Sequence, residues 1–182
     1  METGAISRAN PFLAVLLGIA ACEGGLFAPE SSAPPIRTSA DEYLLETTTI
    51  GWQTEIPFVY ANPSDGPYYL PNCGGSYFYV LEKLVEGRWV VGWGPILPLC
   101  RSPVIRIDAG ATLADTVGVF GGFPGSNFSP KFLMADPQGI YRIVVDALGS
   151  YDEDARPVGP LLRREQRVSN EFRLVTADAP TD

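Results

Sequence analysis

The stretch Ile140-Tyr141-Arg142-Ile143-Val144-Val145-Asp146-Ala147 carries the strongest indication of fold class in this chain. Apolar residues occupy every second position from Tyr141 to Ala147, and the positions between them include Arg142 and Asp146. Successive side chains of a β-strand point to opposite faces of a sheet, so this alternation is typical of a strand with one buried face. We therefore expect a strand in which Tyr141 faces the core and Arg142 faces solvent.

Outward from this stretch, short apolar runs alternate with Gly, Pro, Asn and Asp. The chain has 19 Gly and 17 Pro among 182 residues, which favours frequent turns, and no segment has a sustained helical period. Many short strands without helical crossovers predict an all-β fold, in the form of an antiparallel β-sandwich. The predicted strands cover residues 43–50, 53–61, 76–84, 88–93, 103–108, 112–119, 139–148 and 167–175.

Three motifs refine the fold class. The segment 136–143 (DPQGIYRI) resembles the tyrosine corner of immunoglobulin-like domains, in which a Tyr hydroxyl bonds back to the backbone. The segments 86–89 (EGRW) and 169–172 (SNEF) are similar to the central hairpin and the last strand of bacterial immunoglobulin-like domains. The resemblance implies an immunoglobulin-like sandwich over residues 41–182, with Tyr141 and Trp89 organising its core.

The N-terminal segment reads as a targeting sequence. Residues 12–21 (FLAVLLGIAA) are too few to span a bilayer but have the length of a signal-peptide apolar region. They lead directly to Cys22, and Ile19-Ala20-Ala21-Cys22 resembles the bacterial lipoprotein box, whose cysteine is lipidated. We therefore predict a lipoprotein signal peptide at residues 1–21 and lipid attachment at Cys22. Residues 22–40, rich in Gly, Ser and Pro, then form a disordered tether.

The three cysteines fit an exported protein. Lipidation of Cys22 leaves Cys73 and Cys100 as an even pair, which an oxidising compartment would join. Such a bridge would stabilise the fold by about 3.5 kcal/mol on the chain-entropy model. Because neither cysteine lies in the strands that antibody domains cross-link, we expect the disulfide to hold a loop; two buried free thiols are the alternative.

Composition removes several classes of function. The sequence has no histidine, which excludes histidine-based catalytic triads and histidine metal sites, and its net charge of −8 disfavours a nucleic-acid partner. No cofactor fingerprint, metal-ligand pattern or pairing of a nucleophile with a base is present, so we expect no cofactor and no enzymatic activity. Distant carboxylates that converge in the fold would be the exception.

Together these features predict a lipid-anchored protein of the cell envelope that faces the periplasm or the exterior. Its immunoglobulin-like domain would be a binding or structural module with a protein or glycan partner. The alternative is a peptidase inhibitor on the same sandwich. The segment 94–103 (GPILPLCRSP) is stiffened by proline, and Arg101, which follows Cys100, would suit the acidic pocket of a trypsin-like protease.

Overall fold

The computed structural model describes residues 33–96, 102–152 and 159–177. In this part of the chain the regular structure is β-strand, with no α-helix and a single short 3₁₀ turn, η1 (Arg164–Gln166). The expected all-β fold is therefore confirmed. In chain order the strands are β1 (Ile36–Thr38), β2 (Glu42–Thr47), β3 (Gly51–Ala61), β4 (Tyr68–Leu70), β5 (Asn72–Cys73), β6 (Ser76–Tyr77), β7 (Tyr79–Val85), β8 (Arg88–Trp93), β9 (Ile105–Ile107), β10 (Thr112–Gly122), β11 (Gly139–Val145) and β12 (Phe172–Thr176).

Each predicted strand has a counterpart in the structure, and β8 has the predicted bounds. The sequence did not predict β1, β4 and β5, which are two or three residues long and too short to display an alternating pattern. The predicted strand at 167–175 is interrupted. The Arg167 carbonyl accepts from the Val145 N–H at 2.9 Å, whereas the ladder of β12 with β11 begins only at Phe172.

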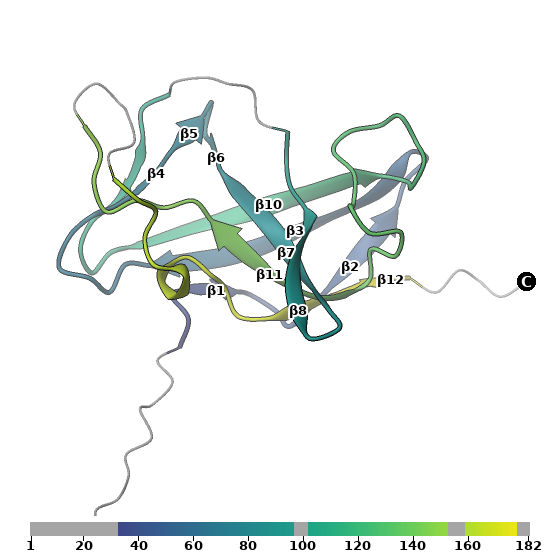
Figure 1. The fold of residues 1–182 in the computed structure, drawn as a ribbon, viewed down its shortest axis with the longest axis horizontal. Coiled ribbons are helices and arrows are strands. Elements are labelled where there is room, and N and C mark those ends of the chain that lie inside the picture. The colour runs from purple at the N-terminus through teal and green to yellow at the C-terminus, as the bar shows by residue number, and fades with distance from the viewer. Residues whose placement is uncertain (1–32, 97–101, 153–158, 178–182) are drawn as a thin grey trace, which may run out of the picture. The chain divides into compact units, whose positions relative to one another are not determined.

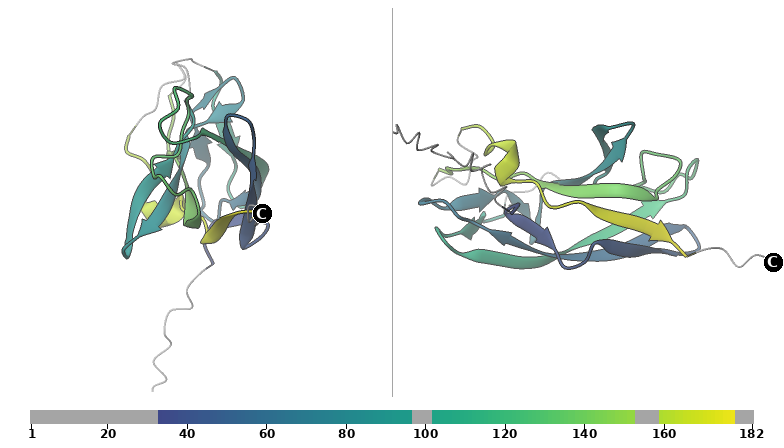
Figure 2. Two further views of the ribbon diagram at one scale, coloured as in Figure 1. Left: turned by 90° about the vertical axis from the view of Figure 1, so that its right-hand side faces the viewer. Right: turned by 90° about the horizontal axis from the view of Figure 1, so that it is seen from below.

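The strands form two layers that share β2. Strands β1 and β10 pair antiparallel with the two edges of β3, and β12, β11, β7 and β8 follow one another in the second layer. The first half of β2 runs parallel to β12, and its end pairs antiparallel with β3. Figure 1 shows β3 and β10 passing behind β7 and β11, and the right-hand view of Figure 2 shows the layers edge-on.

Side chains from both layers meet in one apolar core. Ile56 and Tyr60 of β3 and Leu81 and Ile143 of the facing layer are fully buried. The layers are also joined by a hydrogen bond, because the Trp93 Nε1–H of β8 donates to the Phe120 carbonyl of β10 at 2.8 Å. This bond satisfies the polar end of the most deeply buried indole.

Trp89 does not organise the core, so the prediction from the hairpin motif was wrong on this point. Its side chain is half-buried on the outer face of β8, and Trp93 occupies the core position instead, with 1% of its surface exposed. The cause is a register shift between Leu81 and Glu82, which places Trp93 opposite the buried Leu81. A bulge of this kind changes which side chains of a strand face inward.

The last residues of the predicted tether, 22–40, are ordered, which differs from the expectation. Residues 36–38 form β1, and Ile36 is fully buried. Asn170 fastens β1 through its side chain: the Thr38 N–H donates to Asn170 Oδ1, and Asn170 Nδ2 donates to Thr38 Oγ1, each at 2.8 Å. The compact part of the chain accordingly begins at Ala33 and not at residue 41.

Tyr141 makes the contact that the tyrosine-corner motif predicts. Its ring is fully buried beside Phe172, and its hydroxyl donates to the Pro137 carbonyl at 2.7 Å. Burial, followed by the nearby charge of Asp136, raises the pKa of this phenol, so the hydroxyl keeps its proton and remains a donor.

We expect Tyr141→Phe to lower the free energy of unfolding by about 1–3 kcal/mol, because the buried Pro137 carbonyl loses its donor. Tyr69→Phe is the matched control, since none of the hydrogen bonds among the described residues involves the Tyr69 hydroxyl and its ring is only half-buried. Urea denaturation of the two variants measures the difference. Equal losses would contradict the assigned contact.

Glycines at the end of β10 let a loop pack closely. The strand predicted at 112–119 extends further in the structure, because residues up to Gly122 belong to β10. Gly51 of β3 pairs directly with Gly122, and a Cβ at Gly51 would lie 2.0 Å from the Gly121 carbonyl oxygen. The neighbouring Gly121 has Phe132 against its backbone.

We expect Gly51→Ala to destabilise the protein by about 1–3 kcal/mol or more, because the obstructing atom is backbone and one of the two strands must shift. Gly118→Ala on β10 is the control, since no atom lies within 4 Å of the position that its Cβ would take. Thermal denaturation should show a lowered midpoint for the first variant only. A Gly51→Ala protein as stable as the control would disprove the close approach.

Candidate functional site

The best-defined polar site lies on the outer face of β7, β8 and β11. Glu82 of β7 is opposite Arg142 of β11, and Trp89 of β8 is opposite Leu84 of β7. Because alternate strand residues share a face, Glu82, Trp89 and Arg142 come together on the side away from the core. We call Glu82, Trp89, Val91, Arg142 and Arg164 the arginine–tryptophan face.

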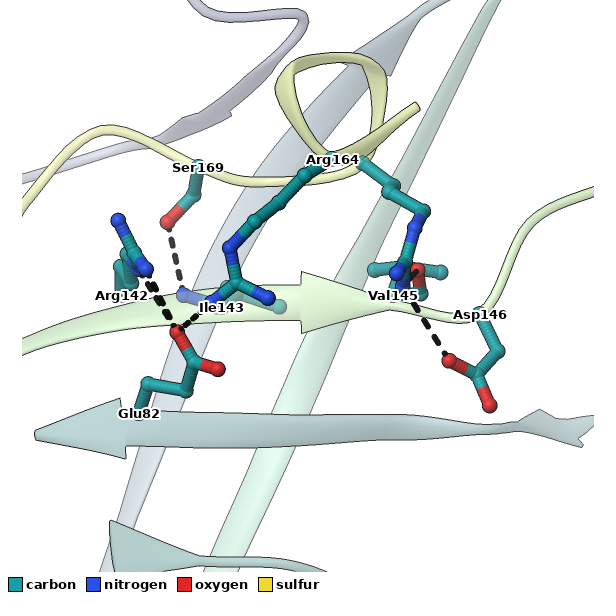
Figure 3. Close-up of polar contacts among 8 residues, drawn as sticks. Glu82, Arg142, Ile143, Val145, Asp146, Arg164 and Ser169 are labelled. Carbon is teal, nitrogen blue, oxygen red and sulfur yellow. Dashed lines mark hydrogen bonds and ion pairs between the residues drawn. The ribbon is translucent and has the colours of Figure 1, made fainter. Parts of the chain in front are cut away.

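Two arginines converge on one carboxylate oxygen. Arg142 donates to Glu82 Oε2 through Nε at 2.9 Å and through Nη2 at 2.8 Å, and Arg164 donates to the same oxygen through its Nη2. Figure 3 shows both guanidinium groups pointing at Glu82 from two different elements: Arg142 lies on β11 and Arg164 on η1. The Arg142 guanidinium carbon also lies 4.0 Å from the centre of the Trp89 ring, which is a cation–π contact.

The site differs from an ordinary surface ion pair in its burial. The side chains of Glu82 and Arg142 are 10% and 17% exposed, and that of Arg164 is 50% exposed. Burial alone would raise the pKa of Glu82, but the hydrogen bonds and charges of Arg164 and Arg142 outweigh it and hold the pKa below its usual range. Glu82 is therefore a carboxylate at neutral pH.

A second set of contacts fixes the segment that carries Arg164. The Ser169 hydroxyl accepts from the Ile143 N–H at 2.8 Å. Arg167 donates to the Val145 carbonyl at 3.3 Å and pairs with Asp146 at 3.5 Å. Burial raises the pKa of Asp146, and the Arg167 charge opposes this shift. These bonds position Arg164 over Glu82.

The arrangement leaves one positive charge without a counter-ion among the five residues of the face. Two guanidinium groups share a single carboxylate, and the half-exposed Arg164 can still donate to an incoming oxygen. On the same face, Val91 lies opposite Glu82 and is 43% exposed, and the half-buried Trp89 ring packs against Arg142. A guanidinium on a face that also presents an aromatic and an aliphatic side chain suits a carboxylate-bearing ligand with an apolar portion.

Of the other predicted site residues, the structure describes some and not others. Cys22, Cys100 and Arg101 lie outside the described residues. Cys73 ends β5 and is 8% exposed. Ser102 and Pro103, which follow Cys100 closely in the chain, lie beside the residues on either side of Cys73. The Gly74 N–H donates to Ser102 Oγ at 2.8 Å, and Asn72 Nδ2 donates to the Pro103 carbonyl.

The position of Ser102 beside Gly74 supports the predicted disulfide between Cys73 and Cys100. We expect both thiols to resist alkylation in denaturant until a reductant is added, as intact mass would reveal. Reduction should cost about 3–4 kcal/mol of stability, because the closed loop no longer restricts the unfolded chain. Alkylation of both cysteines without reductant would contradict the bridge.

The sequence did not predict the role of Glu82 or Arg164 in this site. The residues are remote in sequence, and the 3₁₀ turn that carries Arg164 has no periodic pattern. Arg142 was expected to face solvent, which is wrong because Glu82, Trp89 and η1 cover it. The one available signal was a concentration of basic residues at 163–167 in an otherwise acidic chain.

Two wider properties of the described residues bear on the site. They contain no group of three or more His, Cys, Asp or Glu side chains arranged to hold a metal ion. Nor does this part of the chain include a helix with the length and apolar character needed to cross a membrane.

Comparison with known proteins adds little. No protein-family model matches the chain, and neither does any curated protein. Among solved structures, the alkylpurine DNA glycosylase AlkC of Pseudomonas fluorescens, bound to DNA containing an abasic-site analogue, aligns with a TM-score of 0.32 and 9% identity. The alignment covers 79% of this chain and 31% of the glycosylase chain.

The expectation that this chain has no enzymatic activity is withdrawn. The glycosylase is an enzyme, but a TM-score of 0.32 at 9% identity carries no argument about the activity of this chain. At this TM-score the similarity assigns neither a reaction nor a DNA ligand to the chain.

Proposed function

We propose that this chain is a cell-envelope lipoprotein, held to a membrane by lipid on Cys22, whose immunoglobulin-like β-sandwich binds a partner outside the cytoplasm. The observation that carries the proposal is the apolar run at residues 12–21, which ends in Ile19-Ala20-Ala21 and is followed directly by Cys22. The compact β-domain begins at Ala33, so residues 23–32 are the whole connection between the anchor and the domain.

Two features of the β-domain support an immunoglobulin-like sandwich. The first strand region changes layers, since β2 leaves β12 and joins β3, and this links the two sheets at one side. The second feature is the hydrogen bond from the Tyr141 hydroxyl to the Pro137 carbonyl at the start of β11. The second feature belongs to the pattern implied by the sequence motifs.

The arginine–tryptophan face is the proposed binding surface. Its free donor capacity at Arg164, on the same face as Trp89 and the exposed Val91, fits a protein or glycan that carries carboxylate groups. The overall charge of −8 would repel such a partner elsewhere, so the local positive charge directs it to this face.

Site-specific photocrosslinking tests this binding in an intact envelope. A photoreactive amino acid at position 91 of the full chain should give a discrete adduct, which Arg164→Gln should reduce by roughly tenfold through loss of a charged donor. Glu82 keeps Arg142 as its partner in this variant, so the sheet face remains intact.

Arg173→Gln is the matched control, because Arg173 is an exposed arginine on β12. Its adduct should equal that of the unsubstituted chain. An adduct insensitive to Arg164→Gln, or lost equally in both variants, would refute the arginine–tryptophan face as the binding surface.

A further inference from the structure

Strand β10 is paired along one edge only within the described residues, where its partner is β3. In an antiparallel ladder alternate residues direct their backbone groups to the same neighbour. The Ala111 carbonyl accepts from the Asn62 N–H at 2.9 Å on the β3 side. The even-numbered residues from Thr112 to Gly122 therefore direct their backbone groups to the other edge.

The second half of that edge is covered by other parts of the chain. The Phe120 carbonyl accepts from Trp93 at 2.8 Å, the Gly118 carbonyl accepts from the Tyr79 hydroxyl at 3.5 Å, and the Gly122 N–H donates to Pro130 at 3.0 Å. The first half, Thr112–Thr116, lacks such a cover among the described residues. Ala114, Asp115 and Thr116 are all exposed.

The outer face beside the open half has an exposed aliphatic side chain, Val59, between Arg37 and Ala114. Arg37, Val59 and Ala114 lie side by side on β1, β3 and β10. Val59 is 43% exposed in the middle of this row, and it lines a groove of about 670 Å³ together with Pro57 and Ala114. An open strand edge next to an exposed aliphatic side chain is a site where another strand can pair.

We propose that the occupant is a second copy of this chain, whose β10 pairs antiparallel with the open edge about a two-fold axis at Ala114. The outward-facing residues Thr112, Ala114 and Thr116 read the same in both directions, as an isologous contact requires. Ala114 meets Ala114 of the second copy, and Thr112 meets Thr116, a favourable cross-strand pair.

Charge and shape are compatible with this pairing. The axis joins the Val59–Ala114 row of each copy into one apolar strip, without a charged residue at its centre. Asp115 lies opposite Leu113 of the second copy and not opposite another Asp115. The Thr116 N–H, which now donates to Asp115 Oδ1 at 2.7 Å, exchanges that bond for the Thr112 carbonyl of the second copy.

Sedimentation equilibrium of the full chain in a neutrally buoyant detergent tests the proposal. The unsubstituted chain should form a dimer. Ala114→Lys and Ala114→Glu should each weaken it by roughly tenfold or more, since the axis places like charges together. An equimolar mixture of the two variants should restore dimers, because opposite charges then meet.

Gly118→Lys is the control. It adds the same lysine side chain to the same strand and face, but outside the proposed pairing segment. No atom lies within 4 Å of the position that a Cβ at Gly118 would take. It should dimerise like the unsubstituted chain. A monomer at all concentrations, equal weakening by Gly118→Lys, or a mixture that fails to restore dimers would overturn the proposal.

Discussion

Glu82→Ala should lower the free energy of unfolding by about 3–5 kcal/mol, the range found when one partner of a buried ion pair is removed. The substitution leaves the guanidinium of Arg142, 17% exposed, without its carboxylate. It also releases Arg164, which holds η1 against the sheet. Urea denaturation measures the loss, and hydrogen exchange should show it concentrated in the segment around η1.

Two further variants separate the ion pair from general damage. Glu55→Ala removes an exposed glutamate from β3 and should change stability by no more than about 0.5 kcal/mol. The double variant Glu82→Leu/Arg142→Leu should lose less stability than the sum of the single variants, because the buried guanidinium of Arg142 is removed together with its carboxylate and only the half-exposed Arg164 loses its partner. Additive losses would mean that Glu82 and Arg142 do not interact.

The same pair gives a pH dependence with a definite sign. The pKa of Glu82 is lowered in the folded protein from its usual 4.5, so the unfolded chain binds its proton more readily. Its contribution is therefore complete well above pH 4.5 and is lost as the pH falls through the folded pKa. The stability difference from Glu82→Gln should shrink in acid, and a difference constant from neutral pH to below 4.5 would contradict the shift.

Local patterns predicted the longer β-strands well, and some of these strands, such as β2 and β3, alternate clearly between buried and exposed residues. Tyr141 is buried as its alternation indicates, and β8 has the predicted bounds. The prediction that Trp89 is in the core was wrong because of the register shift between Leu81 and Glu82. That shift depends on how β7 and β8 pair, and the sequence of one strand does not determine it. The sequence of β8 alone does not indicate which of its two tryptophans, Trp89 or Trp93, is buried in the core.

The candidate site was less predictable for a related reason. Glu82 and Arg164 meet only because the segment after β11 returns across the sheet and is fixed by Ser169 and Arg167. A short basic run such as Arg163, Arg164 and Arg167 ordinarily indicates a solvated surface. In the folded protein Arg164 instead pairs with Glu82, a buried carboxylate on β7.

Cys22→Ser should abolish membrane attachment, the largest functional effect that we expect. Acyl chains contribute about 0.8 kcal/mol for each buried CH₂, so their loss removes the membrane affinity of the domain. The serine variant should remain in the aqueous phase after detergent partition. Cys73→Ser is the matched control, since it replaces a cysteine of the folded domain, breaking the predicted bridge, and leaves the proposed attachment site intact.

Incorporation of labelled fatty acid into the full chain tests the proposed lipoprotein most directly. We predict that the unsubstituted chain and Cys73→Ser are both labelled, that Cys22→Ser is not, and that mass spectrometry places the lipid on an N-terminal Cys22. Undiminished labelling of Cys22→Ser, or an unlabelled wild-type chain with residues 1–21 still attached, would contradict the account.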